Sequence, residues 1–287
     1  MEKNTKSLNL VELFENNRCI FPASVNDPVS ARIAEDLGFE ALMLAGSTAS
    51  LAVLGDPDHI LLTLSELSDL TRRICRASSV PLMVDADHGY GNALNVRRTV
   101  QELENSGAAG LSIEDTNLPR PYDIHRSYPL LSVEEGAAKI QAAVEARKSS
   151  SFLIAARTNA PRISSLDDTL KRIESYQKTG VDALFLVGVK TQKQLKTIQE
   201  IVKLPIMLGG AGADLADSDI LVKHGVRFFV QGHQPIQAAI QTVYSTLKSL
   251  REGVKPRDLT GLPDQELIEK VTQKHRYKYL IDRYLEP

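Results

Sequence analysis

The sequence predicts an α/β fold, and within that class a (β/α)₈ barrel of the TIM type. Three observations lead to this prediction. Eight short apolar segments alternate with amphipathic helical segments, several helical segments end in a glycine, and polar residues follow most of the apolar segments. Strands that are apolar throughout are typical of parallel sheets covered by helices on both faces, and eight such strands are enough to close a barrel.

The expected strands read as short, nearly continuous apolar runs. They lie at residues 19–22, 41–44, 80–84, 110–113, 151–155, 183–186, 204–208 and 227–230. Segments such as 65–74 and 166–173 lie between them and repeat their apolar positions at helical spacing. Four strands follow a helical stretch that ends in glycine, the residue that most easily takes the left-handed conformation of a helix stop. These glycines are Gly38, Gly107, Gly180 and Gly225.

Chemically capable side chains follow most of the strands, and this distribution favours a barrel over an open, doubly wound sheet. A barrel enzyme collects its site from the carboxyl ends of many strands, whereas an open sheet concentrates its site at one switch point. The residues are Ser47 after the second strand, Asp85 and Asp87 after the third, Glu114 after the fourth, Arg157 after the fifth and His233 after the eighth.

We expect residues 1–287 to form one barrel domain, with residues 254–287 as a linker and a C-terminal helix extension. Pro263 suits a helix start, and the apolar residues after it repeat at helical spacing. Since the eight-unit barrel is already complete, this helix needs another surface for its apolar stripe. That surface is either its own barrel or a partner subunit.

The composition is that of an ordinary soluble protein, with 43% hydrophobic residues, 24% charged residues and a formal net charge of -2. This balance gives no reason to expect a nucleic acid or a membrane as partner. No apolar run approaches the roughly 18 residues that span a bilayer. The N-terminal segment is unlike a signal peptide, so we expect a cytoplasmic location. Cys19 and Cys75 show no metal-binding spacing, and we expect both to be reduced and buried.

The run VDADHGYG at residues 84–91 places two acids at the end of an apolar strand, next to a glycine-rich turn. Residues i and i+2 of a strand point the same way, so Asp85 and Asp87 are expected to share one face. Two neighbouring carboxylates repel each other unless a cation neutralises them. Together with Glu114 and Asp58 they form an all-oxygen acidic set, which favours Mg²⁺ or Mn²⁺ over Zn²⁺. The alternative is a helix cap and a solvated turn.

Anion-binding groups accompany these acids. Arg157 offers a planar fork suited to a carboxylate, and Gly46 with Ser47 can present backbone N–H groups and a hydroxyl. The pocket therefore suits a small metal-chelating oxyacid. Each residue also has a purely structural alternative: an ion pair for Arg157, and a helix cap for Ser47 and for His233.

Taken in order, several motifs resemble the isocitrate lyase/phosphoenolpyruvate mutase superfamily over nearly the whole chain. They are the DADHGYGN run at 85–92, Ile113-Glu114-Asp115, the GDPD loop at 55–58 and Ala156-Arg157-Thr158. The histidine of the first run, the segment 114–122 and the QGHQ run at 231–234 are most similar to the oxaloacetate decarboxylase branch. Isocitrate and methylisocitrate lyases carry a cysteine-containing lid, whereas this chain reads PRPYDIHR at 119–126 and offers no cysteine there.

The resemblance implies a barrel with a swapped terminal helix, a homotetramer built as a dimer of dimers, and Mg²⁺-dependent handling of a small α-oxo acid. It implies that Asp85 binds Mg²⁺ directly, while Asp58, Asp87 and Glu114 hold metal waters. Catalysis is assigned to Asp85, Arg157 and His233, and substrate contact to Ser47, Arg157 and His233.

The reaction that this resemblance implies is decarboxylation of oxaloacetate to pyruvate and CO₂ through a metal-stabilised enolate, by a carboxy-lyase. The alternative within the fold is a lyase that cleaves a C–C bond of a 2-methylmalate or dimethylmalate. An alternative from another class is a binding or assembly barrel without catalysis.

Overall fold

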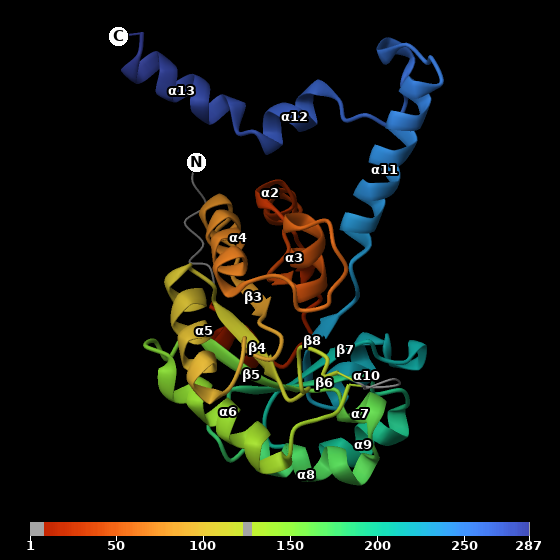
Figure 1. Ribbon diagram of the computed structural model, residues 1–287. Coiled ribbons are helices and arrows are strands. Elements are labelled where there is room, and N and C mark those ends of the chain that lie inside the picture. The colour runs from red at the N-terminus through yellow and green to blue at the C-terminus, as the bar shows by residue number, and fades with distance from the viewer. Residues whose placement is uncertain (1–8, 123–127, 287) are drawn as a thin grey trace.

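The computed structural model describes residues 9–122 and 128–286, and within them eight parallel strands pair in chain order around a barrel (Figure 1). The predicted (β/α)₈ architecture is thereby confirmed. The strands are β1 (Ala23–Ser24), β2 (Leu42–Leu44), β3 (Leu82–Asp85), β4 (Gly110–Glu114), β5 (Leu153–Thr158), β6 (Ala183–Val187), β7 (Ile206–Gly209) and β8 (Val226–Val230).

Helices cover the outside of the strands and end as the glycines predicted: all four take positive φ angles, between 77° and 94°. The α-helices are α1 (Leu10–Glu15), α2 (Pro28–Asp36), α3 (Gly46–Val53), α4 (Leu64–Ala77), α5 (Ala93–Asn105), α6 (Val133–Ala146), α7 (Ala160–Ile163), α8 (Leu166–Tyr176), α9 (Gln192–Gln199), α10 (Ser218–Lys223), α11 (Gln234–Arg251), α12 (Gln265–Val271) and α13 (Lys274–Tyr284). The described residues also form the short 3₁₀ helices η1 (Ala213–Leu215) and η2 (Pro256–Asp258).

The first strand differs from the prediction. Residues 19–22 were expected to form it, but β1 comprises only Ala23 and Ser24. Ile20 instead forms an isolated parallel bridge to Phe228: its N–H donates to Arg227 O at 2.8 Å, and its carbonyl accepts from Phe229 N at 2.9 Å. Pro22 follows this bridge and has no N–H to donate, which breaks the strand before β1 begins. The bridge at Ile20 closes the barrel between its first and last strands.

The core has two parts, which follow from the alternation of side chains along each strand. Alternate strand residues such as Met43 and Phe185 fill the barrel interior, and their neighbours pack outward under the helices. Helix α1 joins the interior cluster, where Phe14 stacks on Phe228 with ring centroids 5.5 Å apart. The N-terminal end of the barrel is therefore filled, and the site residues lie at the opposite, carboxyl end of the strands.

The C-terminal region leaves the barrel. Helix α11 projects away from the strands, and Ile236 is its buried residue (Figure 1). One continuous helix from Pro263 was expected, but two form, because Gln273 takes a left-handed φ of 55° between them. Helix α12 contacts α2 of the same chain, where Lys270 pairs with Asp36 at 2.5 Å. Among the described residues, no helix combines the length and the apolar character needed to cross a membrane.

Both cysteines are free, but each is half-buried and not fully buried as the sequence suggested. Burial raises the pKa of the Cys19 thiol to about 12 and that of the Cys75 thiol to about 11. Both thiols are therefore in the neutral, unreactive form near neutral pH.

Candidate active site

A cavity of about 820 Å³ opens at the carboxyl end of the barrel. Three of the predicted acids and the predicted arginine line it together: Asp58, Asp87, Glu114 and Arg157. The fourth acid, Asp85, ends β3 and is buried beside Arg157. Residues from the loop after α3 and from the ends of β3, β4 and β5 thus meet at one place, as expected of a barrel site.

Asp87 reaches this cavity by a different route from the one the sequence suggested. Strand alternation was expected to place it beside Asp85, but β3 ends at Asp85 and Asp87 has a left-handed φ of 48°. Its N–H donates to Asp85 Oδ1 at 3.3 Å, and its carbonyl accepts from Glu114 N at 2.8 Å. The turn, held to the end of β4, therefore aims the Asp87 carboxylate.

Gly46, the first residue of α3, lies directly against that carboxylate. A Cβ atom on Gly46 would lie 2.5 Å from Asp87 Oδ1 and 2.8 Å from Oδ2, closer than any real Cβ contact. Glycine is therefore needed here for space, since its φ lies outside the left-handed region. Ser47 follows it in the first turn of α3, where backbone N–H groups have no partner within the helix.

The carboxylates destabilise one another. Burial raises the pKa of Asp87 well above its usual value, and the charges of Asp85, Asp58 and Glu114 raise it further. Burial also raises the pKa of Glu114, although Arg157 and a hydrogen bond from Asn159 oppose the shift. Four acids and one arginine leave an excess of negative charge, and water screens it little at the buried Asp85, Asp87 and Glu114. A cation would relieve this repulsion.

The donor set fits a hard divalent cation that keeps water. All four acids supply oxygen, which suits Mg²⁺ or Mn²⁺. Within residues 9–122 and 128–286, no three His, Cys, Asp or Glu side chains converge closely enough to hold an ion by direct contact. Mg²⁺ usually retains several waters and needs only one or two direct carboxylates, so the arrangement suits it.

Arg157 is the counter-ion of the cluster. Its Nη2 lies 3.2 Å from Glu114 Oε2, and its Nη1 donates to Asp85 Oδ2. Burial lowers the pKa of this guanidinium, but the charges of Asp85 and Glu114 outweigh burial, so the pKa is raised and Arg157 stays charged. Its guanidinium carbon lies 5.6 Å from the centroid of the Phe185 ring. The ion pair that the sequence left as an alternative therefore forms, and it forms with the site acids.

Ser47 and His233 lie outside this cavity as the described residues form it. His233 is the first residue before α11 and makes no side-chain cap. Its Nδ1 lies 3.1 Å from Ser24 Oγ on β1, which leaves Nε2 for another partner. Burial lowers the pKa of His233, and the charges of Asp85 and Asp58 oppose that shift. The charges of Asp85 and Asp58 therefore act on the His233 imidazole, although His233 does not line the same cavity.

The structure adds residues that the sequence did not single out. Asn159 donates from Nδ2 to Glu114 Oε2 and, at 2.9 Å, to Thr116 Oγ1. Its place directly after Arg157 and Thr158, at the end of β5, was the available signal. The rest of the cavity wall includes His59, Ile60, Leu118, Pro119, Arg120, Tyr128, Arg162, Ile163 and Val187. Of the lid segment 119–126, residues 123–126, including His125, lie outside the described residues.

Comparisons with known proteins agree on one family. A family model described as phosphoenolpyruvate phosphomutase matches residues 10–251. The chain is 54% identical to an oxaloacetate decarboxylase of Rhodopseudomonas palustris (strain BisB5), over 91% of this chain and 90% of that protein. It is 50% identical to an oxaloacetate decarboxylase of Bradyrhizobium sp. (strain ORS 278), over 95% of this chain and 94% of that protein.

Two solved structures match the whole barrel. One is a phosphonopyruvate hydrolase in complex with oxalate and Mg²⁺, which is 27% identical, with a TM-score of 0.86 over 96% of this chain and 98% of that one. The other is an oxaloacetate acetylhydrolase with the inhibitor 3,3-difluorooxalacetate, which is 25% identical, with a TM-score of 0.84 over 96% of each chain.

Proposed function

Given that this chain belongs to the phosphoenolpyruvate phosphomutase family, we propose that it is an oxaloacetate decarboxylase, a carboxy-lyase that converts oxaloacetate to pyruvate and CO₂ with a divalent cation. One observation carries the proposal. In a chain about half identical to proteins of that name, three acids and an arginine line one cavity at the mouth of the barrel.

The acids have separate roles in this proposal. Asp85 is the direct ligand of Mg²⁺, with Mn²⁺ as the alternative ion, and Asp58, Asp87 and Glu114 hold its waters. When bound there, the ion supplies Lewis-acid polarisation of the substrate's oxo group. Asp85 Oδ1 already accepts from Ser112 Oγ at 3.0 Å, which fixes the orientation of the carboxylate. The other carboxylate oxygen, Asp85 Oδ2, accepts a hydrogen bond from Arg157 Nη1.

Arg157 therefore exchanges partners when substrate binds. Its Nη1 releases Asp85 Oδ2 and pairs with a substrate carboxylate, while Nη2 keeps Glu114. The guanidinium is half-buried, and a charge-assisted hydrogen bond is stronger there than in open solvent. Ser47 contributes its hydroxyl and a free N–H at the start of α3, and His233 contacts the substrate through Nε2 with Ser24 holding its other nitrogen.

The bond changes are simple. The bond between C3 and C4 of oxaloacetate breaks, C4 leaves as CO₂, and the electron pair moves toward the 2-oxo oxygen to give an enolate. One proton added at C3 then gives pyruvate. The residues named here bind and orient the substrate for this cleavage and stabilise the developing negative charge with Arg157.

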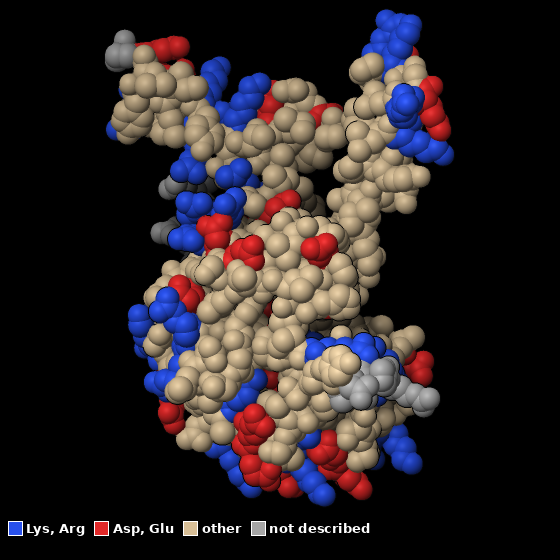
Figure 2. All heavy atoms as spheres, viewed as in Figure 1, with Lys and Arg blue, Asp and Glu red and all other residues tan. Residues whose placement is uncertain are grey.

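The assembly that we propose is a homotetramer, a dimer of dimers, in which α11 and the extension 254–287 pack on a second copy. Helix α11 has no charged residue before Lys248, and the part of it nearest the barrel is tan in Figure 2. Ile240, Val243, Tyr244 and Leu247 on this helix are 49% to 65% exposed. So many exposed apolar residues on one helix indicate a missing partner. The C-terminal swap and the cytoplasmic location stay predictions.

The test is a comparison of pyruvate release from oxaloacetate by protein with Mg²⁺ and by Mg²⁺ alone. The blank is necessary because the ion in solution can chelate the substrate in the same way. We expect the protein to exceed the blank and Asp85→Asn to remove the excess. Asp69→Asn on α4, where Asp69 pairs with Arg72 and Arg73 away from the cavity, should keep the excess. Equal rates with and without protein would sink the proposal. Pyruvate from 2-methylmalate or dimethylmalate would favour the lyase alternative, and oxalate binding without turnover of any α-oxo acid would favour a binding barrel.

A further inference from the structure

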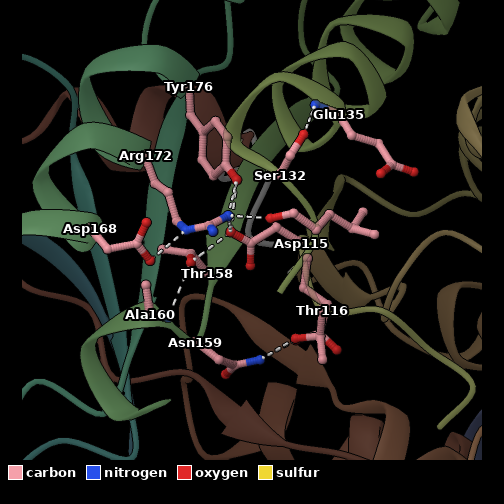
Figure 3. A network of polar contacts seen from close by, with 12 residues as sticks. Asp115, Thr116, Ser132, Glu135, Thr158, Asn159, Ala160, Asp168, Arg172 and Tyr176 are labelled. Atoms are coloured by element: carbon pink, nitrogen blue, oxygen red, sulfur yellow. Dashed lines mark hydrogen bonds and ion pairs between the residues drawn. The ribbon is translucent and has the colours of Figure 1, made fainter. Parts of the chain in front are cut away.

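A buried polar network joins the ends of β4 and β5 to helix α8 (Figure 3). Asp115 Oδ2 accepts three hydrogen bonds, from Thr158 Oγ1 at 2.8 Å, Arg172 Nη1 at 2.9 Å and Tyr176 OH at 2.7 Å. All four residues are buried, Asp115 and Thr158 at 1% exposure and Tyr176 at 0%. Such a concentration of polar groups in a barrel core is costly unless their hydrogen bonds are made.

The network is one residue away from the site on both strands. β4 and β5 pair with Glu114 opposite Arg157, so Asp115 and Thr158 are the next residues along the two strands. The bond from Thr158 to Asp115 therefore joins the ends of these strands immediately beyond Glu114 and Arg157. Asp115 directly follows Glu114, so the hydrogen bonds that hold Asp115 also restrain the backbone of Glu114.

The same network also fastens the loop that forms one wall of the cavity. Arg172 Nη1 donates to Leu131 O at 3.0 Å, and Leu131 N donates to Asp115 O at 2.8 Å. Further into the same loop, Asn117 N donates to Pro129 O at 2.8 Å. The two ends of the loop after β4 are thus held together, and its residues Leu118 to Arg120 and Tyr128 face the cavity.

The surrounding helices are built to admit this network. Gly136 of α6 leaves room for the Tyr176 hydroxyl, since a Cβ there would lie 2.4 Å from that oxygen. On α8, Arg172 is oriented by Asp168, whose Oδ2 accepts from Arg172 Nε at 3.0 Å. The guanidinium therefore bridges an acid in the first turn of its own helix and an acid at the strand end (Figure 3).

We propose that Asp115, Thr158, Arg172 and Tyr176 are positioning residues for the decarboxylation: they set the spacing between Glu114 and Arg157 and the place of the loop wall, without touching substrate. The inference rests on the proposed function. It follows from geometry, since catalytic groups must be held to within about 0.5 Å by residues whose own rotamers are locked.

A matched control exists at the other end of β5. Arg147 pairs with Asp182 at 2.5 Å, and Asp182 accepts from Ile154 N at 2.8 Å, near the start of the strand. This pair also joins an arginine, an acid and β5, but it lies far from the cavity along the strand. Arg147→Lys therefore perturbs a similar interaction without a route to the site.

The experiment compares Thr158→Val, Thr158→Ser, Tyr176→Phe, Arg172→Lys and Arg147→Lys in the full-length protein with Mg²⁺. Three quantities are measured for each: Tm, kcat and KM for oxaloacetate, and the affinity for oxalate by calorimetry. We expect Thr158→Val and Tyr176→Phe to lower kcat about tenfold or more and to weaken oxalate binding, and Thr158→Ser, which keeps the hydroxyl, to restore both. Arg147→Lys should keep kcat within about twofold at a comparable loss of Tm.

The proposal is overturned if Thr158→Val and Tyr176→Phe keep the wild-type kcat and oxalate affinity. It is also overturned if Arg147→Lys loses as much kcat as they do for the same loss of Tm. If Arg172→Lys does not fold, Thr158→Val and Tyr176→Phe still test the proposal. Oxalate affinity separates this inference from the proposed function. A wild-type protein that binds oxalate with Mg²⁺ but does not decarboxylate oxaloacetate refutes only the function, and the affinities of the variants still test positioning.

Discussion

Replacing Gly46 by alanine should damage the site without damaging the fold. The new Cβ would lie 2.5 Å from Asp87 Oδ1, 2.8 Å from Oδ2 and 2.9 Å from Cγ. Because all three atoms are too close, rotation of the carboxylate gives no relief, and either Asp87 or the start of α3 must move. Restoring ordinary contact requires a shift of about 1 Å. A misplacement of about 1 Å can cost about a hundredfold in rate, which equals about 2.7 kcal/mol in the barrier.

The Gly46→Ala substitution should leave the stability of the fold unchanged or raise it slightly. Gly46 lies in helix α3 with φ outside the left-handed region, and alanine is favoured over glycine in a helix by up to about 1 kcal/mol. We therefore expect kcat for oxaloacetate to fall about ten- to a hundredfold and the Mg²⁺ concentration for half-maximal rate to rise, while Tm stays within a few degrees. Pyruvate release and a thermal melt measure these quantities. The control is Val53→Ala, at the exposed end of the same helix. A Gly46→Ala protein with unchanged kcat and Mg²⁺ dependence would refute the role given to Asp87.

Four further outcomes are expected. Arg162 lines the cavity, so Arg162→Gln should raise KM for oxaloacetate severalfold with kcat unchanged. Oxalate has no carboxylate that corresponds to C4 of oxaloacetate, so its inhibition should stay as it was, and a parallel loss of oxalate inhibition would contradict this prediction. The Cys75 thiol, with its pKa raised to about 11 by burial, should react with iodoacetamide at pH 8 far more slowly than a cysteine in a short peptide does, and equal rates would show that its pKa is not raised. Burial lowers the pKa of His224, so its imidazole is protonated at a higher pH in the unfolded chain than in the folded protein. The free energy of unfolding should therefore fall as pH drops below about 6.5, and His224→Gln should flatten the dependence of Tm on pH in that range. Leu247→Glu on α11 should reduce the oligomer to smaller species in sedimentation analysis, and an unchanged oligomer would exclude this helix from the interface.

The sequence predicted the strands and helices well because each depends on local pattern. The seven strands from β2 to β8 lie within a few residues of their expected places, and the four glycines stop their helices with positive φ. Errors occurred where a partner decides the boundary. β5 begins at Leu153, because a turn bond from Phe152 N to Ser149 O precedes it, and it continues to Thr158 through pairing with β4 and β6.

For the site, residue type and position at a strand end were enough to select Asp87, Glu114 and Arg157, and Asp58 was selected as an acid on a loop. The structure brings these four residues into one cavity. The reason given for Asp87 was wrong, because a turn and not strand alternation aims it. Asn159 was missed although it directly follows Arg157 and Thr158, because its acceptors, Glu114 and Thr116, are known only from the structure.

The sequence by itself determined the order of elements, the residue types of the acidic cluster and the end of the barrel at which they gather. These properties depend on hydrophobic periodicity and on the single direction of parallel strands. Only the tertiary structure decided the partners: Arg157 with Asp85 and Glu114, and Asp115 with Arg172 and Tyr176 from α8. Hydrogen bonds and charge interactions act over a few ångströms, so they depend on the register between strands and on how a helix packs against them, and the spacing of residues along the chain does not encode either.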